Sequence, residues 1–218
     1  MFLKMTDIKI SGKHKKLFYR ILYVITGITI ISIGLTFMRY SSLGVDPVTC
    51  LNIGIAKRVG MSFGTWVLII NIIMLIGVFI FDRSQIGFGT LYNMITIGYT
   101  SDFLLWLIKK IPLFESFSLQ TRIISFVLGM PVLYFGAAVY IETNMGTAPY
   151  DAIAIIIAEK IKKQNWFRWI RIGTDALCVI GGILTQGDIG IGTLLTVLFA
   201  GPLIASFRKF KIFQIIQE

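Results

Sequence analysis

Apolar runs separated by short charged or glycine-rich breaks alternate along the whole chain. Eight runs can be delimited, at residues 17–38, 47–59, 65–81, 87–108, 122–141, 149–161, 170–185 and 189–207. Several exceed 16 residues with hardly a charge, which is typical of membrane-spanning helices. The second and sixth hold 13 residues and reach only about 20 Å, less than a hydrocarbon core of about 30 Å. The pattern predicts an all-α, polytopic membrane protein of about eight spans, with short, broken second and sixth helices.

The composition agrees with this pattern. Of the 218 residues, 56% are hydrophobic and 15% are charged, whereas a globular chain averages about 25% charged. A net charge of +10 would suggest nucleic acid in a soluble domain, but lysine and arginine also accumulate on the cytoplasmic flank of membrane helices. We therefore expect the lipid bilayer as the surroundings and no nucleic-acid partner.

The distribution of cations bears on whether the two short runs cross the membrane. With eight crossings and the N-terminus inside, 19 of the 21 lysines and arginines lie inside, leaving Arg39 and Arg83 outside. If residues 47–59 and 149–161 instead enter and return, the split is 15 to 6. The positive-inside rule favours eight crossings with both termini cytoplasmic, although the sequence leaves complete crossing by these segments open. A basic cytoplasmic tail, 1–16, then precedes a single transmembrane domain, 17–218.

The second half of the chain resembles the first at a spacing of 102 to 103 residues. The matched pairs are Arg20 and Arg122, Gly27 and Gly129, Gly34 and Gly136, Gly44 and Gly146, Pro47 and Pro149, Trp66 and Trp169, and the IGxGT motifs at 86–90 and 189–193. This collinear series indicates an internal repeat. Each half would hold four spans, so we expect two parallel four-helix repeats, about 17–110 and 119–211, related by an axis along the membrane normal.

Glycine-rich breaks precede four of the helices. Pro47 and Pro149 suit the first turn of a helix, and the IGxGT motifs open two more. With eight crossings, all four helix N-termini face one outward vestibule that attracts an anion or a carboxylate. The candidate binding residues at these starts are Gly44, Pro47, Gly87, Gly89, Thr90, Gly146, Gly190, Gly192 and Thr193. The alternative is that the glycines form tight turns and close helix contacts. Four glycines spaced seven apart in pairs should form packing faces: Gly27, Gly34, Gly129 and Gly136.

Acidic residues at membrane depth are the second group of candidates, because a charge buried in the membrane is costly and usually functional. Asp46 and Asp151 flank the two proline-led helix starts, while Asp102 lies deep in the fourth run and Asp175 in the seventh. Each is a candidate for carrying a proton or a cation. Neutral polar candidates at membrane depth are Thr49, Asn52, Asn71 and Asn93.

Simpler roles for the acidic residues remain open. Asp46 and Asp151 are alternatively helix caps. The other two carboxylates are alternatively partners for Arg122 or Arg20 near the inner face. If neutral variants of both Asp102 and Asp175 keep full activity, the functional interpretation of these two residues is wrong.

Several kinds of chemistry lack the residues that they need. The single histidine, His14, lies in the basic tail, which excludes a histidine-based metal site or a Ser-His-Asp triad within the membrane. No GxxxxGK[ST] loop is present to bind ATP. Cys50 and Cys178 have no CxxC spacing and should be free, buried thiols. We expect no enzyme activity, no cofactor and no bound metal.

Three motifs carry a resemblance to a known family: SLGVDPVT at 42–49, GMSFGTW at 60–66 and GFGTLYN at 87–93. In these motifs the chain resembles the YczE/YyaS/YitT group of bacterial membrane proteins, well over residues 20–110 and more loosely afterwards. Asp151 after Pro149 is similar to the Pro-aromatic-Asp order of that group, whereas Asp46 precedes its proline. The resemblance implies a multi-pass protein of the bacterial cytoplasmic membrane.

Repeats, broken helices and buried carboxylates are together typical of transporters. The leading hypothesis is a transporter or permease for an unidentified small molecule or ion. Without an ATP site, it would be a secondary transporter, a channel, or the membrane partner of a separate energising protein. The alternative is an accessory membrane protein that transports nothing and binds a partner protein or a lipid.

Overall fold

The chain folds into helices joined by short loops. The computed structural model describes residues 12–112, 117–161 and 166–210, and these ranges contain no strand. The described residues form eight α-helices: α1 (Gly12–Ser41), α2 (Pro47–Val59), α3 (Phe63–Phe81), α4 (Phe88–Ile108), α5 (Leu119–Glu142), α6 (Pro149–Lys160), α7 (Phe167–Thr185) and α8 (Ile191–Phe207), with a short 3-10 helix, η1 (Arg83–Gln85), before α4. Among the described residues, α1, α3 and α5 are long and apolar enough to cross a membrane. The all-α polytopic fold is confirmed, and only α1 departs clearly from the expected bounds, since it begins within the basic tail.

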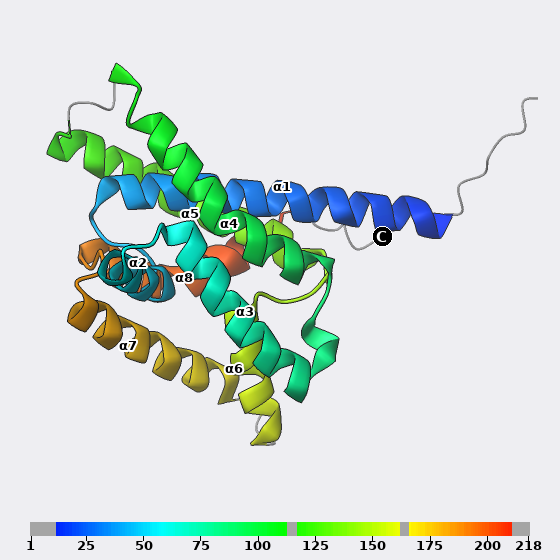
Figure 1. Cartoon of the computed structure of the whole chain (residues 1–218). Coiled ribbons are helices and arrows are strands. Elements are labelled where there is room, and N and C mark those ends of the chain that lie inside the picture. Colours follow the sequence, from blue (N-terminus) through cyan, green and yellow to red (C-terminus); the bar gives the residue numbers. More distant parts are fainter. Residues whose placement is uncertain (1–11, 113–116, 162–165, 211–218) are drawn as a thin grey trace, which may run out of the picture.

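The most extensive helix–helix contact in the described chain joins α1 and α5, which lie side by side (Figure 1). Gly27 of α1 meets Gly136 of α5, and Gly34 meets Gly129. A Cβ on Gly34 would lie 2.3 Å from the backbone nitrogen of Leu133 and 2.7 Å from the Gly129 carbonyl oxygen. The two backbones therefore touch, and the expected packing role of these glycines is confirmed.

The direction of the two helices differs from the expected parallel arrangement. The first glycine of the α1 pair meets the second glycine of the α5 pair, so the helices run antiparallel. At the start of α5, Arg122 donates from Nε to the Ser41 carbonyl at 2.7 Å and from Nη2 to the Ser42 carbonyl at 2.9 Å. We call this end of the bundle the Ser41 end and the opposite one, where α5 finishes, the Glu142 end. An axis that relates α1 to α5 lies across the helices and not along them.

Helix α2 begins and finishes at the Ser41 end. Just before it, the Leu43 carbonyl accepts a hydrogen bond of 2.8 Å from Gly192 in the first turn of α8. Near its last turn, Lys57 forms an ion pair of 2.7 Å with Asp188 in the loop that leads into α8. Figure 1 shows α2 nearly end-on, so it runs across the direction of α1. This short helix therefore lies across the bundle, with both of its ends at the Ser41 end.

Helix α6 occupies the corresponding position at the Glu142 end. The Met145 carbonyl accepts a hydrogen bond of 2.7 Å from Gly89 in the first turn of α4, and the Thr147 N–H donates to the Gln85 carbonyl at 2.9 Å. At the other end of α6, the Lys160 ammonium lies 3.6 Å from the centre of the Phe81 ring, at the end of α3. Both ends of α6 thus lie near the loop between α3 and α4.

These positions correct the expected eight crossings. Because α5 begins where α1 stops, the three helices between them cannot all cross the membrane, and α2 is the one that returns. The glycine-rich breaks 42–47 and 186–193 lie at the Ser41 end, while 82–90 and 142–149 lie at the Glu142 end. The contacts of the two halves correspond: α1 packs on α4 as α5 packs on α8, and α2 packs on α7 as α6 packs on α3.

Candidate functional site

A cluster of charged side chains joins α6 to α7 near mid-length of α7. Arg171 forms ion pairs with Asp151 of α6 and with Asp175, one turn further along α7, the second at 3.3 Å. The Tyr150 hydroxyl donates to Asp175 Oδ1 at 2.8 Å, and the Arg171 guanidinium lies 4.5 Å from the centre of the Tyr150 ring. Asp175 is the ninth of the 19 residues of α7. We call Tyr150, Asp151, Arg171 and Asp175 the Arg171 cluster.

Asp46 and Tyr134 approach the Arg171 cluster from α2 and α5. Asp46 lies within electrostatic range of Arg171 and Asp175, and Tyr134 lies within range of all three. Asp46 is also the N-cap of α2, where it accepts a hydrogen bond of 3.0 Å from the Thr49 N–H. Two of the four predicted carboxylates, Asp151 and Asp175, therefore meet at Arg171, and the capping role expected for Asp46 is present.

The charges around Arg171 do not balance. Asp151 and Asp175 share one arginine, so the group carries an excess of one negative charge when both carboxyls are ionised, and Asp46 nearby adds a further carboxyl. An uncompensated charge away from water is unfavourable, and a bound proton or cation relieves it. In the described part of the chain, no three acidic, histidine or cysteine side chains lie close enough to hold one metal ion. The group is therefore suited to a proton or to a cation held by one or two carboxylates.

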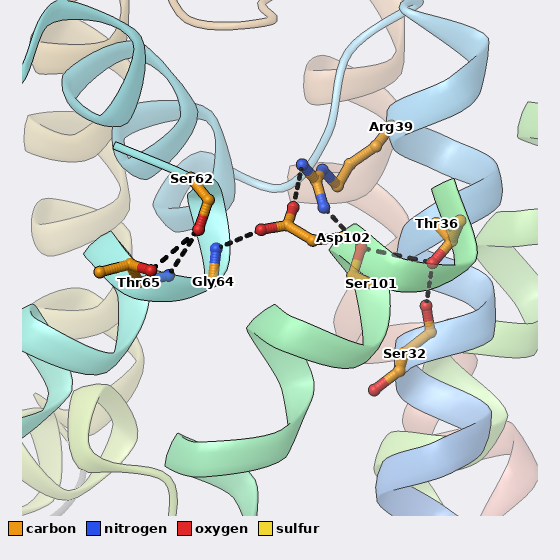
Figure 2. Close-up of polar contacts among 8 residues, drawn as sticks. All are labelled: Ser32, Thr36, Arg39, Ser62, Gly64, Thr65, Ser101 and Asp102. Atoms are coloured by element: carbon orange, nitrogen blue, oxygen red, sulfur yellow. Dashed lines mark hydrogen bonds and ion pairs between the residues drawn. The ribbon is translucent and has the colours of Figure 1, made fainter. Parts of the chain in front are cut away.

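Asp102 lies apart from this cluster, at the Ser41 end. Its Oδ1 forms an ion pair of 2.9 Å with Nη2 of Arg39, and its Oδ2 accepts a hydrogen bond of 2.7 Å from the Gly64 N–H (Figure 2). Arg39 Nη1 also donates to Ser101 Oγ at 2.8 Å, and its guanidinium lies 4.1 Å from the Phe63 ring centre. The partner of Asp102 is thus Arg39, and neither Arg122 nor Arg20 as the sequence suggested. These contacts join the ends of α1, α3 and α4.

At the Ser41 end, a glycine-rich loop of the first half packs against α8. The Gly192 N–H donates to the Leu43 carbonyl at 2.8 Å. A Cβ on Gly44, whose φ is +116°, would lie 2.6 Å from the Thr193 nitrogen, so a larger residue has no room there. The Gly190 N–H donates to Thr193 Oγ1 at 3.4 Å, which fixes the start of α8. We call this arrangement the Leu43 contact.

The equivalent Met145 contact lies at the Glu142 end. The Gly89 N–H donates to the Met145 carbonyl at 2.7 Å. A Cβ on Gly146, whose φ is +106°, would lie 2.4 Å from Thr90 Oγ1. The Gly87 N–H donates to Thr90 Oγ1 at 3.2 Å, as at the start of α8. The amides of Gly89 and Gly192 therefore already have carbonyl partners, and the glycine-rich starts face two ends of the bundle instead of one vestibule.

The neutral polar candidates divide into two kinds. Asn52 is buried and accepts a hydrogen bond of 3.0 Å from the Trp66 indole N–H, which ties α2 to α3. Asn71 of α3 and Asn93 of α4 are only 8% and 7% exposed, and their amides form no hydrogen bond with any described residue. No fully buried side-chain nitrogen or oxygen of the described chain lacks a partner. The amides of Asn71 and Asn93 are therefore not completely enclosed by protein atoms.

Sequence comparison identifies the family of this chain. A model of the family of unknown function DUF6198 matches residues 18–209, from α1 to just beyond α8. The chain belongs to the DUF6198 family. The DUF6198 protein is 33% identical over 187 residues to the uncharacterized protein YyaS of Bacillus subtilis strain 168, covering 85% of this chain and 90% of YyaS. The expected YczE/YyaS membership is confirmed.

Two further relatives extend across most of the DUF6198 protein. The uncharacterized membrane protein YczE of Bacillus subtilis strain 168 is 26% identical over 205 residues, covering 93% of this chain and 90% of YczE. An uncharacterized protein of Haemophilus influenzae is 27% identical over 180 residues, covering 83% of this chain and 79% of its own length. No solved structure matches the chain.

The arginines of both polar groups were missed by reasoning from the sequence, which treated them as markers of membrane orientation. A signal for Arg171 was present, because Asp175 follows it by four residues and such pairs face each other on a helix. Arg39 gave no comparable signal, since 63 residues separate it from Asp102. Tyr150 stood beside Asp151 in the sequence, but its hydroxyl bond to α7 depends on how α6 packs.

Proposed function

We propose that this DUF6198 protein is a secondary transporter of the bacterial cytoplasmic membrane, and that its Arg171 cluster binds a proton or a small cation. The observation that carries the proposal is the excess of carboxylates over arginine in a group assembled from α6 and α7. The group is partly exposed, with side-chain exposures of 20% for Asp175, 34% for Arg171 and 41% for Asp151, and charged groups at membrane depth persist mainly where an ion or proton must bind and leave. The cation is either the cargo or the ion that drives uptake of another small molecule.

The arrangement of the helices supports transport. Antiparallel first helices and corresponding contacts in the two halves are what an inverted repeat produces, and many secondary transporters are built in this way. We infer that residues 17–110 and 119–211 are such repeats, with α2 and α6 as their short, broken helices. Both termini are cytoplasmic in this arrangement, because 15 of the 21 lysines and arginines then lie on the side of the N-terminus.

The source of energy is an ion gradient, since the chain has no ATP-binding loop. A separate energising protein is the alternative within the same proposal. Neither arrangement requires enzyme chemistry in this chain, and the lipid bilayer and the cargo are its expected partners.

Proton movement tests the proposal directly. Purified protein is reconstituted into liposomes that contain the pH-sensitive dye pyranine, and a proton gradient or a valinomycin-set potassium potential is imposed. We expect the wild type to acidify the interior faster than protein-free liposomes. Asp175→Asn should fall to the protein-free rate, because an amide neither carries the proton nor pairs with Arg171. Tyr150→Phe, which removes only the hydroxyl that donates to Asp175, should lower the rate with less risk to folding.

Asp82→Asn is the matched control, because Asp82 lies in the loop between α3 and α4, outside the cluster. Hydrogen bonds from the Ser84 hydroxyl and N–H lower the pKa of Asp82, so it is ionised but remote from the pathway. This variant should keep the wild-type rate. If wild type and protein-free liposomes behave alike under proton, sodium and potassium gradients, the protein moves none of these cations as its sole cargo, which leaves coupled transport of a separate cargo or the accessory role. Mass spectrometry of co-purified molecules would then identify the partner or lipid.

A further inference from the structure

Two ion pairs occupy corresponding positions at opposite ends of the bundle. Arg39, in the last turn of α1, pairs with Asp102, which lies six residues before the end of α4. Glu142, the last residue of α5, pairs with Arg208, directly after α8. Each pair thus joins the C-terminal ends of the first and fourth helices of one half. Because α1 and α5 run antiparallel, the first pair lies at the Ser41 end and the second at the Glu142 end.

Each ion pair has one deeply buried partner. The Arg39 side chain is 9% exposed and that of Glu142 is 4% exposed, whereas Asp102 and Arg208 are 25% and 48% exposed. Removing one partner of a buried ion pair is strongly destabilising. Contacts of this kind suit a switch with two states.

Both ion pairs lie beside a loop that leads into a broken helix. At the Ser41 end, Arg122 holds the carbonyls of Ser41 and Ser42, immediately before the Leu43 contact. At the Glu142 end, the Tyr140 hydroxyl donates to the Gly146 carbonyl at 3.0 Å, within the Met145 contact. Separation of the helix ends would therefore move α2 at one end or α6 at the other. These are the helices that bring Asp46 and Asp151 to the Arg171 cluster.

We propose that the Arg39–Asp102 and Glu142–Arg208 ion pairs are two gates that open in alternation and give access to the Arg171 cluster from opposite faces of the membrane. Both pairs are formed in this structure, so the helix ends are held together at both ends of the bundle. Opening one end while the other pair stays formed exposes the cluster to one face only. The inference rests on the proposed transport function for its purpose, but its test requires neither a substrate nor a gradient.

The protein contains its own reporter of access. Cys178 of α7 is buried, 8% exposed, and its Sγ lies 3.7 Å from the Tyr150 hydroxyl. The other thiol, Cys50 of α2, is completely buried. In a Cys50→Ala background, a membrane-impermeant methanethiosulfonate reagent then reports whether the cluster is reached. Labelling is measured on right-side-out spheroplasts and on inside-out vesicles.

The gates predict labelling from opposite faces. Arg39→Gln should raise the rate of Cys178 labelling from the face of the Ser41 end by about fivefold or more, and Arg208→Gln should do so from the other face. Lys57→Gln is the control, because it removes the exposed Lys57–Asp188 pair at the Ser41 end without touching α1 or α4. It should label at the background rate.

Three results would overturn the proposal: labelling of both variants from the same face, no rise in either variant, or an equal rise in the Lys57→Gln control. If a glutamine variant fails to fold, Arg39→Lys and Arg208→Lys keep the charge but lose the guanidinium geometry. These lysine variants should raise the rate of Cys178 labelling by a smaller factor, each from the same face as its glutamine counterpart. If neither lysine variant raises the labelling rate, the gates are equally contradicted. Opposite-face labelling in a protein that moves no cation would contradict the transport proposal while supporting the gates.

Discussion

Single glycine residues set how closely the helices of this protein approach. In the membrane, apolar side chains gain little by meeting each other instead of lipid, so helices associate through close backbone packing and polar contacts. Gly34 shows how little room remains, since its missing side chain is replaced by the backbone of Leu133. Gly77 in α3 is different, because a Cβ there would meet no described atom within 4 Å.

Gly34→Ala should therefore destabilise the protein by about 1–3 kcal/mol or more, since the new methyl group pushes α1 away from α5. Gly77→Ala should instead stabilise it by up to about 1 kcal/mol, because alanine is the better helix former. Thermal stability in detergent, followed by size-exclusion chromatography of heated samples, distinguishes the two. Equal melting temperatures for both variants would contradict the contact between the α1 and α5 backbones.

Contacts could be predicted from the sequence only where the residues that form them show a local, repeating pattern. The glycines that touch between α1 and α5 were found because they repeat seven residues apart on one helix face. The meeting of Asp151 and Asp175 at Arg171 could not be found, because a local pattern does not record which helix packs on which. The ion pair between Arg39 and Asp102 could not be predicted for the same reason.

At the scale of elements, local sequence signals fix where the short helices α2 and α6 begin. Asp46 caps α2 through the Thr49 N–H, Pro47 occupies the first turn, and Gly60 ends the helix at φ +68°. Helix α6 also has a proline in its first turn but lacks a side-chain cap, and its early acidic residue, Asp151, pairs with Arg171 instead. The two starts therefore share their proline chemistry and differ in the use of their aspartates.

Two substitutions separate the cap of α2 from the charge at the same position. Asp46→Asn keeps the cap, since asparagine and aspartate cap helices about equally well, but it removes the negative charge near Arg171. Asp46→Ala removes both and should cost about 1 kcal/mol of stability. If the charge serves the Arg171 cluster, Asp46→Asn should keep the wild-type melting temperature but lose cation movement in the pyranine assay. Wild-type transport in Asp46→Asn would mean that Asp46 is only a cap.

At the scale of the whole molecule, the direction of the second half was the feature that the sequence predicted wrongly. The segment bounds follow from hydropathy and agree with the helices to within a few residues, apart from the start of α1. Orientation depends on whether a 13-residue run crosses the membrane, and the cation counts for the two alternatives, 19 to 2 and 15 to 6, both favour the side of the N-terminus. The stronger asymmetry favoured eight crossings, so the charge pattern pointed to the arrangement that the structure contradicts.

Single cysteines test this orientation in a background without Cys50 and Cys178. In the structure, exposed Ser42 and Met61 flank α2 at the Ser41 end, while exposed Asn144 lies at the Glu142 end. An impermeant thiol reagent should therefore label Ser42→Cys and Met61→Cys from one face and Asn144→Cys from the other. Eight complete crossings would give the opposite grouping, with positions 42 and 144 together and position 61 alone.

The Leu43 and Met145 contacts also constrain how the chain is made. The Gly89 amide lies in the first turn of α4, where no carbonyl of its own helix can accept its hydrogen bond. Its acceptor, Met145, leaves the ribosome only after α5 has been synthesised. An amide left without a partner in lipid costs several kcal/mol, so the nascent first half should be retained at the translocon until its counterpart arrives. A chain truncated before α5 would be a substrate for quality-control proteolysis.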